Sequence, residues 1–256
     1  IADGNDTLVI APTGSGKTLA AFLWAIDRLA ATERPADRPR TRVLYISPLK
    51  ALAVDVERNL RTPLTGIARI AERNGAGVPD ISVGVRSGDT TAKARRDLIT
   101  TPPDILITTP ESLFLMLTSA ARRTLAGVET VIVDEVHAVA GTKRGAHLAL
   151  SLERLDALLE TRAQRIGLSA TVRPPEEVAR FLSGTGAAAT AIVAPPAAKT
   201  FDLTVQVPVP DMANLDNNSI WPAVEERIVD LIEAHRSSLV FPNRRRLAER
   251  LTAPLN

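Results

Sequence analysis

The sequence predicts an α/β protein built on a doubly wound parallel sheet. Short apolar runs rich in β-branched residues alternate along the chain with longer helical patterns. Within these runs apolar residues occupy successive positions, as Val131, Ile132 and Val133 do in ETVIV (129–133), which predicts strands buried on both faces. Strands that alternate with helices and are covered on both faces are typical of a parallel sheet. The 256 residues suffice for one large domain or for one and a half smaller ones.

The alternation continues as far as residue 183. We expect strands at 7–11, 42–47, 81–86, 104–108, 129–133 and 165–168. Between them we expect helices at 17–31, 49–61, 110–118, 145–160 and 175–183.

The composition changes at Gly184, where GTGAAATAIVAPPAAKT indicates a domain edge and a linker. Beyond it we expect a strand at 201–207, a helix from about Trp221 to His235, a strand at 238–241 and a basic helix from Asn243. These elements are too few to close a core, so they indicate the beginning of another α/β domain. The predicted domains are 1–195 and 196–256.

The composition narrows the function classes. The net charge of only +2 does not by itself indicate a nucleic-acid binder. The absence of cysteine excludes disulfides, zinc knuckles and iron–sulfur clusters, and it fits an intracellular, cytoplasmic setting. No apolar run approaches the roughly 18–20 residues that cross a membrane, so we expect no membrane partner. Because the first residue is Ile1, we expect the chain to be a fragment.

A glycine-rich stretch, APTGSGKT from Ala11 to Thr18, links the first predicted strand to the first predicted helix. Gly14 and Gly16 allow the backbone to wrap closely around phosphate, and the N–H groups of the turn point inward as donors. Lys17 supplies a cation for the β- and γ-phosphates, and Thr18 supplies a hydroxyl for Mg²⁺. Ala11 replaces the first glycine of the general motif, and a turn that only caps a helix is the alternative. The strand–loop–helix context favours a phosphate site.

Two adjacent carboxylates, Asp134 and Glu135, follow the strand predicted at 129–133. Such a pair is costly to bury unless a cation or a reacting water lies beside it. In a P-loop ATPase, the acidic residue at the end of a neighbouring strand holds Mg²⁺ through water, and the next carboxylate can act as the general base. Acidic residues that only cap the next helix are the alternative. The phosphate loop favours the catalytic interpretation.

Two further strand ends, YISPLKAL (45–52) and ITTPESL (107–113), carry Ser or Thr and then Pro at the expected first helical position. This arrangement leaves free helix N–H groups at the carboxyl edge of the sheet, where ligands bind in doubly wound folds. With Lys50 beside one of them, these helix starts suit the phosphates of a nucleic-acid strand. Aromatic residues form only 3% of the chain, which favours contact with the sugar–phosphate backbone over base stacking.

In chain order, APTGSGKT, SPLKAL, SGD (87–89), TTPESL, DEVH (134–137) and SAT (169–171) resemble the motifs of the first motor domain of superfamily 2 DExH-type helicases. Longer runs, among them LYISPLKALAVDVERNL and HAVAGTKRGAHLALSLERL, are similar to the large helicase-related (Lhr) family. The resemblance covers nearly all of residues 4–183 and continues into SLVFPNRRRLAERL (238–251). It implies a RecA-like fold followed by the start of a second RecA-like domain, as in the N-terminal motor fragment of an ATP-dependent helicase.

The resemblance also implies roles for single residues in ATP hydrolysis. The residues that would bind ATP–Mg²⁺ are Thr13, Gly14, Ser15, Gly16, Lys17 and Thr18. Asp134 would hold the metal together with Thr18, and Glu135 would activate the hydrolytic water. His137 would bridge to the SAT segment, where Ser169 and Thr171 would report the nucleotide state to the nucleic-acid surface. A histidine at a helix start with no partner is the alternative for His137.

A second set of residues would form a track for a nucleic-acid strand. The candidates are Pro48, Lys50, Arg86, Thr109, Pro110, Glu111 and Ser112. A solvated charge is the alternative for Arg86, and Arg144 either reaches nucleic acid or pairs with a carboxylate. We interpret Arg244 to Arg246 as a solvated basic helix face, and His147 and His235 as ordinary helix residues.

For the whole protein, the resemblance implies single-stranded DNA and DNA or RNA:DNA duplexes as partners. It further implies an ATPase that single-stranded DNA stimulates, 3′-to-5′ movement, a DNA-repair setting, C-terminal domains of the parent chain, and no need for an oligomer. The chain departs from the family pattern because it lacks the adenine-reading segment before the phosphate loop. The arginine fingers of the second motor domain would lie beyond Asn256, so residues 1–256 alone are expected to be nearly inactive. A non-motor P-loop NTPase, either a nucleotide-gated binding module or a phosphotransferase, is the alternative.

Overall fold

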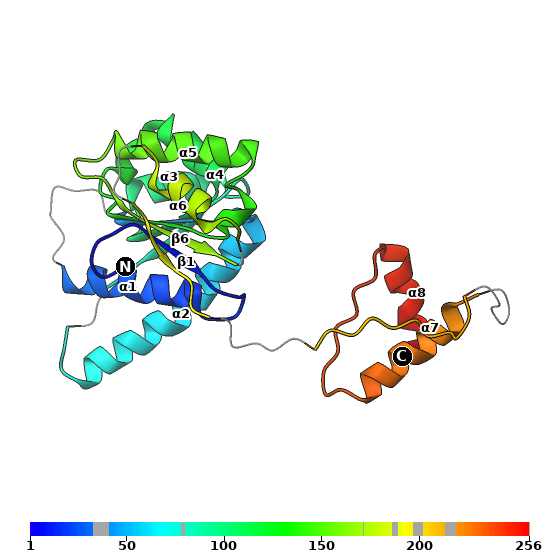
Figure 1. Cartoon of the computed structure of the whole chain (residues 1–256). Coiled ribbons are helices and arrows are strands. Elements are labelled where there is room, and N and C mark those ends of the chain that lie inside the picture. Colours follow the sequence, from blue (N-terminus) through cyan, green and yellow to red (C-terminus); the bar gives the residue numbers. More distant parts are fainter. Residues whose placement is uncertain are drawn as a thin grey trace. The chain divides into compact units, whose positions relative to one another are not determined.

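The chain forms two compact units, Ile1–Ala197 and Ala198–Asn256 (Figure 1). The computed structural model describes residues 1–32, 41–77, 80–170, 172–185, 189–196, 202–212 and 219–255. None of the helices within these ranges combines the length and apolar character that a membrane span requires.

Unit 1 is built on a seven-stranded sheet whose neighbouring strands all run parallel. The strands are β1 (Thr7–Ile10), β2 (Val43–Ile46), β3 (Val83–Arg86), β4 (Ile105–Thr108), β5 (Thr130–Val133), β6 (Gln164–Ser169) and β7 (Ala191–Val193). Their order across the sheet is β3-β4-β2-β5-β6-β1-β7. The doubly wound parallel sheet predicted from the sequence is confirmed, and every strand predicted before residue 183 is present.

Helices cover both faces of this sheet (Figure 1). They are α1 (Lys17–Ala31), α2 (Lys50–Arg73), α3 (Ala92–Thr100), α4 (Pro110–Leu117), α5 (Lys143–Asp156) and α6 (Pro175–Ser183), with the short 3-10 helices η1 (Ala120–Leu125) and η2 (Val136–Ala138). In β2, Val43 and Tyr45 pack with α1 and α2, whereas Leu44 and Ile46 pack with α4 to α6 on the other face. Each strand therefore needs apolar residues at successive positions.

Helix α2 is longer than predicted because it continues through Pro63 to Arg73. Proline removes one backbone hydrogen bond from a helix interior, so the predicted end at residue 61 was reasonable but wrong. Beyond the proline, Leu64 and Ile67 pack against the core cluster on the α1 face. This apolar burial offsets the lost hydrogen bond.

Helix α3 and strand β7 of unit 1 were not predicted, and neither were the short 3-10 helices. Helix α3 has no buried residue, so its sequence lacks an apolar stripe from which to predict it. Strand β7 lies in the stretch after Gly184 that was predicted to be a linker. It pairs in parallel with β1, whose outer edge would otherwise present unpaired N–H and C=O groups.

Unit 2 contains α7 (Trp221–Glu233) and α8 (Arg245–Leu255). The strands predicted at 201–207 and 238–241 are wrong, because the described residues of both segments form no strand. A strand needs a neighbour that pairs its backbone, and the described part of unit 2 offers none. Helix α7 ends before His235, which therefore lies just outside the helix.

Candidate nucleotide site and nucleic-acid interface

The loop between β1 and α1 has the backbone conformation that phosphate binding requires. Gly14 and Gly16 have φ angles of 81° and 87°, in the left-handed region that glycine adopts readily. Gly16 is the N-cap of α1, where no side chain caps the helix and no acidic residue lies in the first turn. The N–H groups and the positive dipole of this helix end are therefore suited to an anion.

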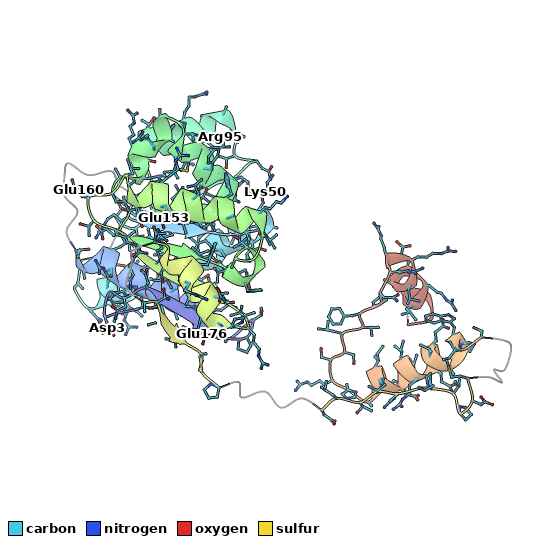
Figure 2. All side chains as sticks on the ribbon, turned by 45° about the horizontal axis from the view of Figure 1, so that its top comes forward. Asp3, Lys50, Arg95, Glu153, Glu160 and Glu176 are labelled. Atoms are coloured by element: carbon cyan, nitrogen blue, oxygen red, sulfur yellow. The ribbon has the colours of Figure 1, made fainter. Side chains whose placement is uncertain are left out.

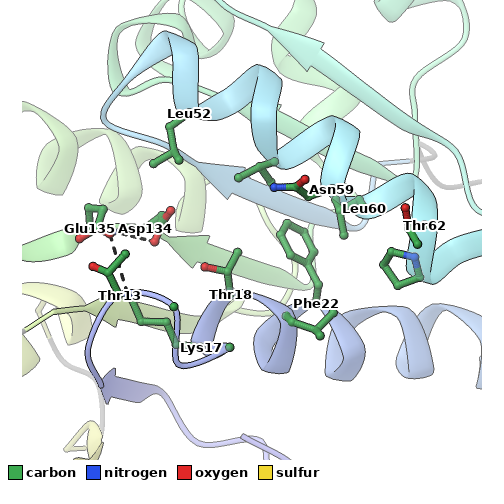
Figure 3. Close-up of a pocket in the computed structure, with 15 residues that line it drawn as sticks. Thr13, Lys17, Thr18, Phe22, Leu52, Asn59, Leu60, Thr62, Asp134 and Glu135 are labelled. Atoms are coloured by element: carbon green, nitrogen blue, oxygen red, sulfur yellow. Dashed lines mark hydrogen bonds and ion pairs between the residues drawn. The ribbon is translucent and has the colours of Figure 1, made fainter. Parts of the chain in front are cut away.

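A cavity of about 750 Å³ lies beside this loop, between α1 and α2 (Figure 3). Its polar part is lined by Thr13, Gly14, Gly16, Lys17, Thr18, Asp134 and Glu135. Its apolar part is lined by residues of α1 and α2 that include Phe22, Leu52, Val56, Leu60 and Pro63. Ser15 is exposed in the loop, where its N–H donates to the carbonyl of Pro12 at 3.2 Å. The cavity thus joins the predicted phosphate residues to the predicted acidic pair.

Lys17 and Glu135 face each other across the polar part of the cavity (Figure 3). Lys17 is only 7% exposed, and its Nζ lies 3.9 Å from Oε1 of Glu135. Among the described residues, Glu135 is the only non-glycine residue with a positive φ, at 44°. A conformation of this kind costs of order 1–3 kcal/mol and is typical of functional positions.

Asp134 is held by three backbone and side-chain groups. It is 3% exposed, and its N–H donates to the carbonyl of Ile46 on the neighbouring strand at 2.9 Å. Its Oδ1 accepts the N–H of Glu135 at 2.9 Å, and its Oδ2 accepts the hydroxyl of Tyr45. Both carboxylate oxygens therefore have fixed donors.

Tyr45 was missed in the sequence analysis. It lies on β2 next to β5, is fully buried, and stacks on Phe22 with the ring centroids 4.9 Å apart. Burial and the negative charge of Asp134 raise the pKa of Tyr45, so that its hydroxyl remains a donor. The strand order was needed to find it, because only that order brings Tyr45 beside the acidic pair.

These residues fit a magnesium–nucleotide. Nothing lies within 4 Å of the points where a Cβ on Gly14 or Gly16 would project, so the loop is open to a close ligand. Magnesium is usually held by one or two carboxylates together with substrate phosphates and waters. Within the described ranges, no group of three or more His, Cys, Asp or Glu residues could hold a metal. The Thr18 hydroxyl and the Asp134 carboxylate are suited to a metal that phosphates also bind.

His137 lies at the SAT segment, as expected. Its Nδ1 is 3.1 Å from the hydroxyl of Ser169, accepts the N–H of Ala170 at 3.4 Å, and is 3.4 Å from Oε2 of Glu135. Ser169 in turn accepts the backbone N–H of Ala11 at 3.1 Å through its carbonyl. The end of β6 therefore contacts the phosphate loop directly and is linked to Glu135 through His137. Thr171 lies outside the described residues.

The two predicted helix starts differ. Thr109 is the N-cap of α4, with its hydroxyl accepting the N–H of Ser112 at 3.4 Å, and Pro110 is the first helical residue. Helix α2 instead begins at Lys50 with no side-chain cap, so the prediction of Pro48 at the first helical position is wrong. The reason is a local turn, in which the hydroxyl of Ser47 donates to the carbonyl of Leu49 at 3.0 Å.

Lys50 and the SGD turn contact each other. The Nζ of Lys50 lies 2.8 Å from Oδ1 of Asp89, and both side chains are largely exposed. A Cβ on Gly88 would lie 3.0 Å from the same Nζ, so the lysine rests against the turn. Lys50 therefore lies at the predicted track, and the negative charge of Asp89 partly neutralises its positive charge.

Of the two alternatives for Arg144, contact with nucleic acid or a pair with a carboxylate, the structure shows the carboxylate pair. Its Nε and Nη2 donate to the two carboxylate oxygens of Glu111 at 2.5 and 2.9 Å, and its Nη1 donates to the carbonyl of Pro48 at 2.6 Å. The hydrogen bonds from Arg144 lower the pKa of Glu111 to about 2. The carboxylate of Glu111 is therefore engaged within the protein.

Arg86 is buried, with an exposed fraction of 8%, which excludes the alternative of a solvated charge. His147 packs on Phe114, with ring centroids 4.6 Å apart, as a helix residue of α5. Arg244 to Arg246 are exposed, in agreement with a solvated basic face.

Comparison with known proteins gives consistent matches. The DEAD/DEAH box helicase family matches residues 1–180. Over its whole length the chain is 79% identical to the Lhr helicase/probable uracil glycosylase of Mycolicibacterium smegmatis, and it spans 17% of that protein. It is 56% identical, again over its whole length, to the Lhr helicase/uracil glycosylase of Escherichia coli, of which it spans 18%.

A solved structure of Mycobacterium smegmatis helicase Lhr bound to ssDNA and AMP-PNP matches with a TM-score of 0.82 and 79% identity, covering 100% of this chain and 32% of that one. The predicted RecA-like fold and the resemblance to Lhr helicases are therefore confirmed. The family match includes the phosphate loop, the acidic pair and both helix starts. The chain belongs to the DEAD/DEAH box helicase family.

Proposed function

We propose that residues 1–195 are the first, ATP-binding motor domain of an Lhr-type ATP-dependent helicase, and that residues 196–256 are a linker and the incomplete start of the second motor domain. The observation that carries the proposal is the buried Lys17 of the phosphate loop, which faces Glu135 at 3.9 Å, next to Asp134. The names and bound ligands of the relatives support a motor rather than a phosphotransferase.

In this proposal each residue of the cavity has a separate role. The binding residues are Thr13, Gly14, Ser15, Gly16, Lys17 and Thr18. Asp134 and Thr18 hold Mg²⁺, which when bound offsets negative charge on the phosphates. Glu135 accepts a proton from the attacking water. Tyr45 fixes the carboxylate of Asp134 through its hydroxyl.

The nucleotide site and the nucleic-acid surface are adjacent in the same unit. We propose that His137, Ser169 and Thr171 couple the two. Phosphates of the strand contact the residues proposed for the track, Pro48, Lys50, Arg86, Thr109, Pro110, Glu111 and Ser112. The contribution of Glu111 is indirect, because its carboxylate binds Arg144, which also holds the Pro48 carbonyl.

For the whole protein we propose single-stranded DNA as the loading strand, 3′-to-5′ movement, and DNA or RNA:DNA duplexes as substrates in a DNA-repair setting. The further domains of the parent chain act with this one, and no oligomer is required. Binding through backbone phosphates is expected to weaken steeply with salt and to show little sequence preference.

The test is ATP turnover by the full-length protein with and without single-stranded DNA. Lys17→Ala should abolish nucleotide binding, because Lys17 is the cation that the phosphate loop places in the cavity. Glu135→Gln should retain nucleotide binding while turnover falls by about 10²–10⁴-fold. Glu176→Gln, an exposed position in the first turn of α6, is the matched control and should behave as wild type. Normal turnover in Glu135→Gln would contradict the assignment of the base, and turnover that DNA does not raise would contradict the motor.

A further inference from the structure

Three arginines near the C-terminal ends of α4 and α5 have no acidic partner. Arg122 and Arg123 lie in η1, which follows α4, and Arg154 lies in the last turn of α5. All three are exposed, and no carboxylate within the described part of the chain forms an ion pair with any of them. Glu153, the neighbour of Arg154 that Figure 2 labels, instead accepts a hydrogen bond from Nη2 of Arg165 at 3.1 Å. The surface at these helix ends therefore carries positive charge that is free to meet an anion.

A small cavity of about 180 Å³ lies between two of these arginines. It is lined by Leu117, Arg122, Arg154, Ala157 and Leu158, and this lining includes no carboxylate. Sites for small-molecule ligands usually measure about 300–1,000 Å³, so this cavity is suited to a single side chain. Two guanidinium groups beside apolar carbon atoms fit a carboxylate side chain, whose methylene groups would contact the leucines.

Apolar side chains lie beside the arginines. The ring of Phe114 in α4 packs on His147 of α5, with centroids 4.6 Å apart, and the guanidinium of Arg154 lies 5.7 Å from its centroid. Leu115 is 55% exposed, and Leu150, which follows His147 by three residues and so lies on the same side of α5, is 60% exposed. The helix dipole explains a basic residue in the last turn of α5, but it does not explain exposed leucines next to it. Aromatic residues and arginine beside apolar residues are typical of the centre of a protein–protein interface.

This surface is separate from the nucleotide cavity and from the proposed track. The cavity lies between α1 and α2, which cover the other face of the sheet from α4 and α5. Both α4 and α5 follow strands that end at the carboxyl edge, so their last turns lie towards the amino edge. A partner bound there would leave the nucleotide site and the start of α4 open.

We propose that this surface docks an acidic, amphipathic helix of a partner protein. The α4–α5 surface consists of Phe114, Leu115, Arg122, Arg123, His147, Leu150 and Arg154. The apolar stripe of the partner helix covers the two leucines, and its carboxylates bind the arginines, one of them inside the small cavity. The inference does not depend on the proposed function, because none of these residues belongs to the nucleotide site or to the track.

Two other occupants fit the α4–α5 surface less well. A nucleic-acid strand offers phosphates to the arginines but no apolar group to Leu115 and Leu150, and the ring of Phe114 already packs on His147 and Arg154. A second copy of the chain that used the same surface would place arginines against arginines. Charge complementarity therefore favours a partner rich in carboxylates.

The first experiment measures the binding of a synthetic peptide to the full-length protein. The labelled peptide, of about 18 residues, forms a helix with leucines along one face and glutamates beside them. Fluorescence anisotropy should show binding that weakens as salt is added. A peptide with lysine in place of each glutamate, and one with serine in place of each leucine, should each bind about tenfold more weakly or worse. Equal binding of either control peptide would overturn the proposal, because the surface would then not require both features of the partner.

The second experiment locates the peptide on the protein. In the double variant Arg122→Gln/Arg154→Gln and, separately, in Leu150→Ser, the acidic peptide should bind about tenfold more weakly. Arg69→Gln/Arg73→Gln removes the same charge from exposed positions of α2 and should leave peptide binding as in wild type. All of these variants should keep the wild-type melting temperature, since exposed side chains without ion pairs contribute little to stability. An equal loss of binding in the α2 variant, or a lower melting temperature with unchanged peptide affinity in the first two, would refute the assignment.

The third experiment determines whether the α4–α5 surface is free in the whole protein. Leu150→Cys and Ile70→Cys place thiols on α5 and α2 at positions that are each 60% exposed. A maleimide should label both at the same rate in the full-length protein, and the acidic peptide should slow the labelling of Leu150→Cys alone. Protection of Leu150→Cys without peptide would show that another part of the same protein covers the surface, and this would overturn the assignment to a separate partner. Duplex DNA that displaces the peptide, and that itself binds more weakly to Arg122→Gln/Arg154→Gln, would assign the surface to nucleic acid and would equally overturn the proposal.

Discussion

Replacing Tyr45 by Phe removes a single hydroxyl from the nucleotide site. The fully buried ring and its stack on Phe22 at 4.9 Å would remain, since Phe has the same shape. The change deletes the hydrogen bond to Oδ2 of Asp134, a residue that is 3% exposed. A hydrogen bond to a charged acceptor contributes about 1.5–3 kcal/mol.

We expect this loss to appear as a weaker response to Mg²⁺. Groups that orient a metal-binding carboxylate usually change metal affinity about 10–100-fold when they are removed. The Mg²⁺ concentration that gives half-maximal ATP binding should therefore rise about tenfold or more in Tyr45→Phe. Nucleotide binding without Mg²⁺ should be unchanged, because Lys17 and the glycine loop are intact. Equilibrium fluorescence titrations of the full-length protein with a labelled nucleotide measure both quantities.

A matched variant separates the hydroxyl from the packing. Phe22→Leu disturbs the aromatic stack and leaves the hydroxyl of Tyr45 in place. The reasoning is refuted if Tyr45→Phe shows the wild-type Mg²⁺ dependence, or if Phe22→Leu shifts it by the same factor.

Two further predictions concern stability. Glu111→Gln should lower the free energy of unfolding at pH 7 by about 0.5–1 kcal/mol, a small value because the Glu111 side chain is 56% exposed and its pair with Arg144 is screened. Since the pKa of Glu111 is lowered to about 2, the pair stabilises fully above the ordinary value of 4.5 and is lost as the pH falls towards 2; denaturant unfolding at pH 7 and pH 3 should show the difference shrink, and a growing difference would contradict this. Gly145→Ala should lower the free energy of unfolding by about 3 kcal/mol or more, because the new Cβ would lie 2.0 Å from the carbonyl oxygen of Val139. Gly141→Ala, where nothing lies within 4 Å of the new Cβ, is the control; equal melting temperatures of the two variants would contradict the close approach of Gly145 to Val139.

Strands and helices with one consistent apolar pattern could be predicted from the sequence. Strand β5 could be predicted because Val131, Ile132 and Val133 are apolar at successive positions, and α1 because the glycine loop marks its start. Helix α3 buries no residue, so no pattern indicates it. The strand predictions in unit 2 were wrong because alternating apolar and polar residues form a strand only where a neighbouring strand pairs with them.

The candidate site followed the same division. Lys17 and Glu135 could be identified from the sequence, because each belongs to a short motif whose local fold places the side chain. Tyr45 could not, because its role depends on which strand lies beside its own. Arg144 shows the intermediate case: the sequence left two partners open, and only the spatial approach of α4 to α5 supplies Glu111 as the partner.

The contacts of Arg144 have a mechanical consequence. One guanidinium joins the starts of three segments, the turn before α2 through Pro48, α4 through Glu111, and α5 through its own position. The hydrogen bonds of Arg144 therefore hold the three starts at a fixed distance from one another. A nucleic-acid strand on the proposed track would therefore meet these three starts at an interval that the protein sets, and its own phosphate-to-phosphate distance would have to match that interval.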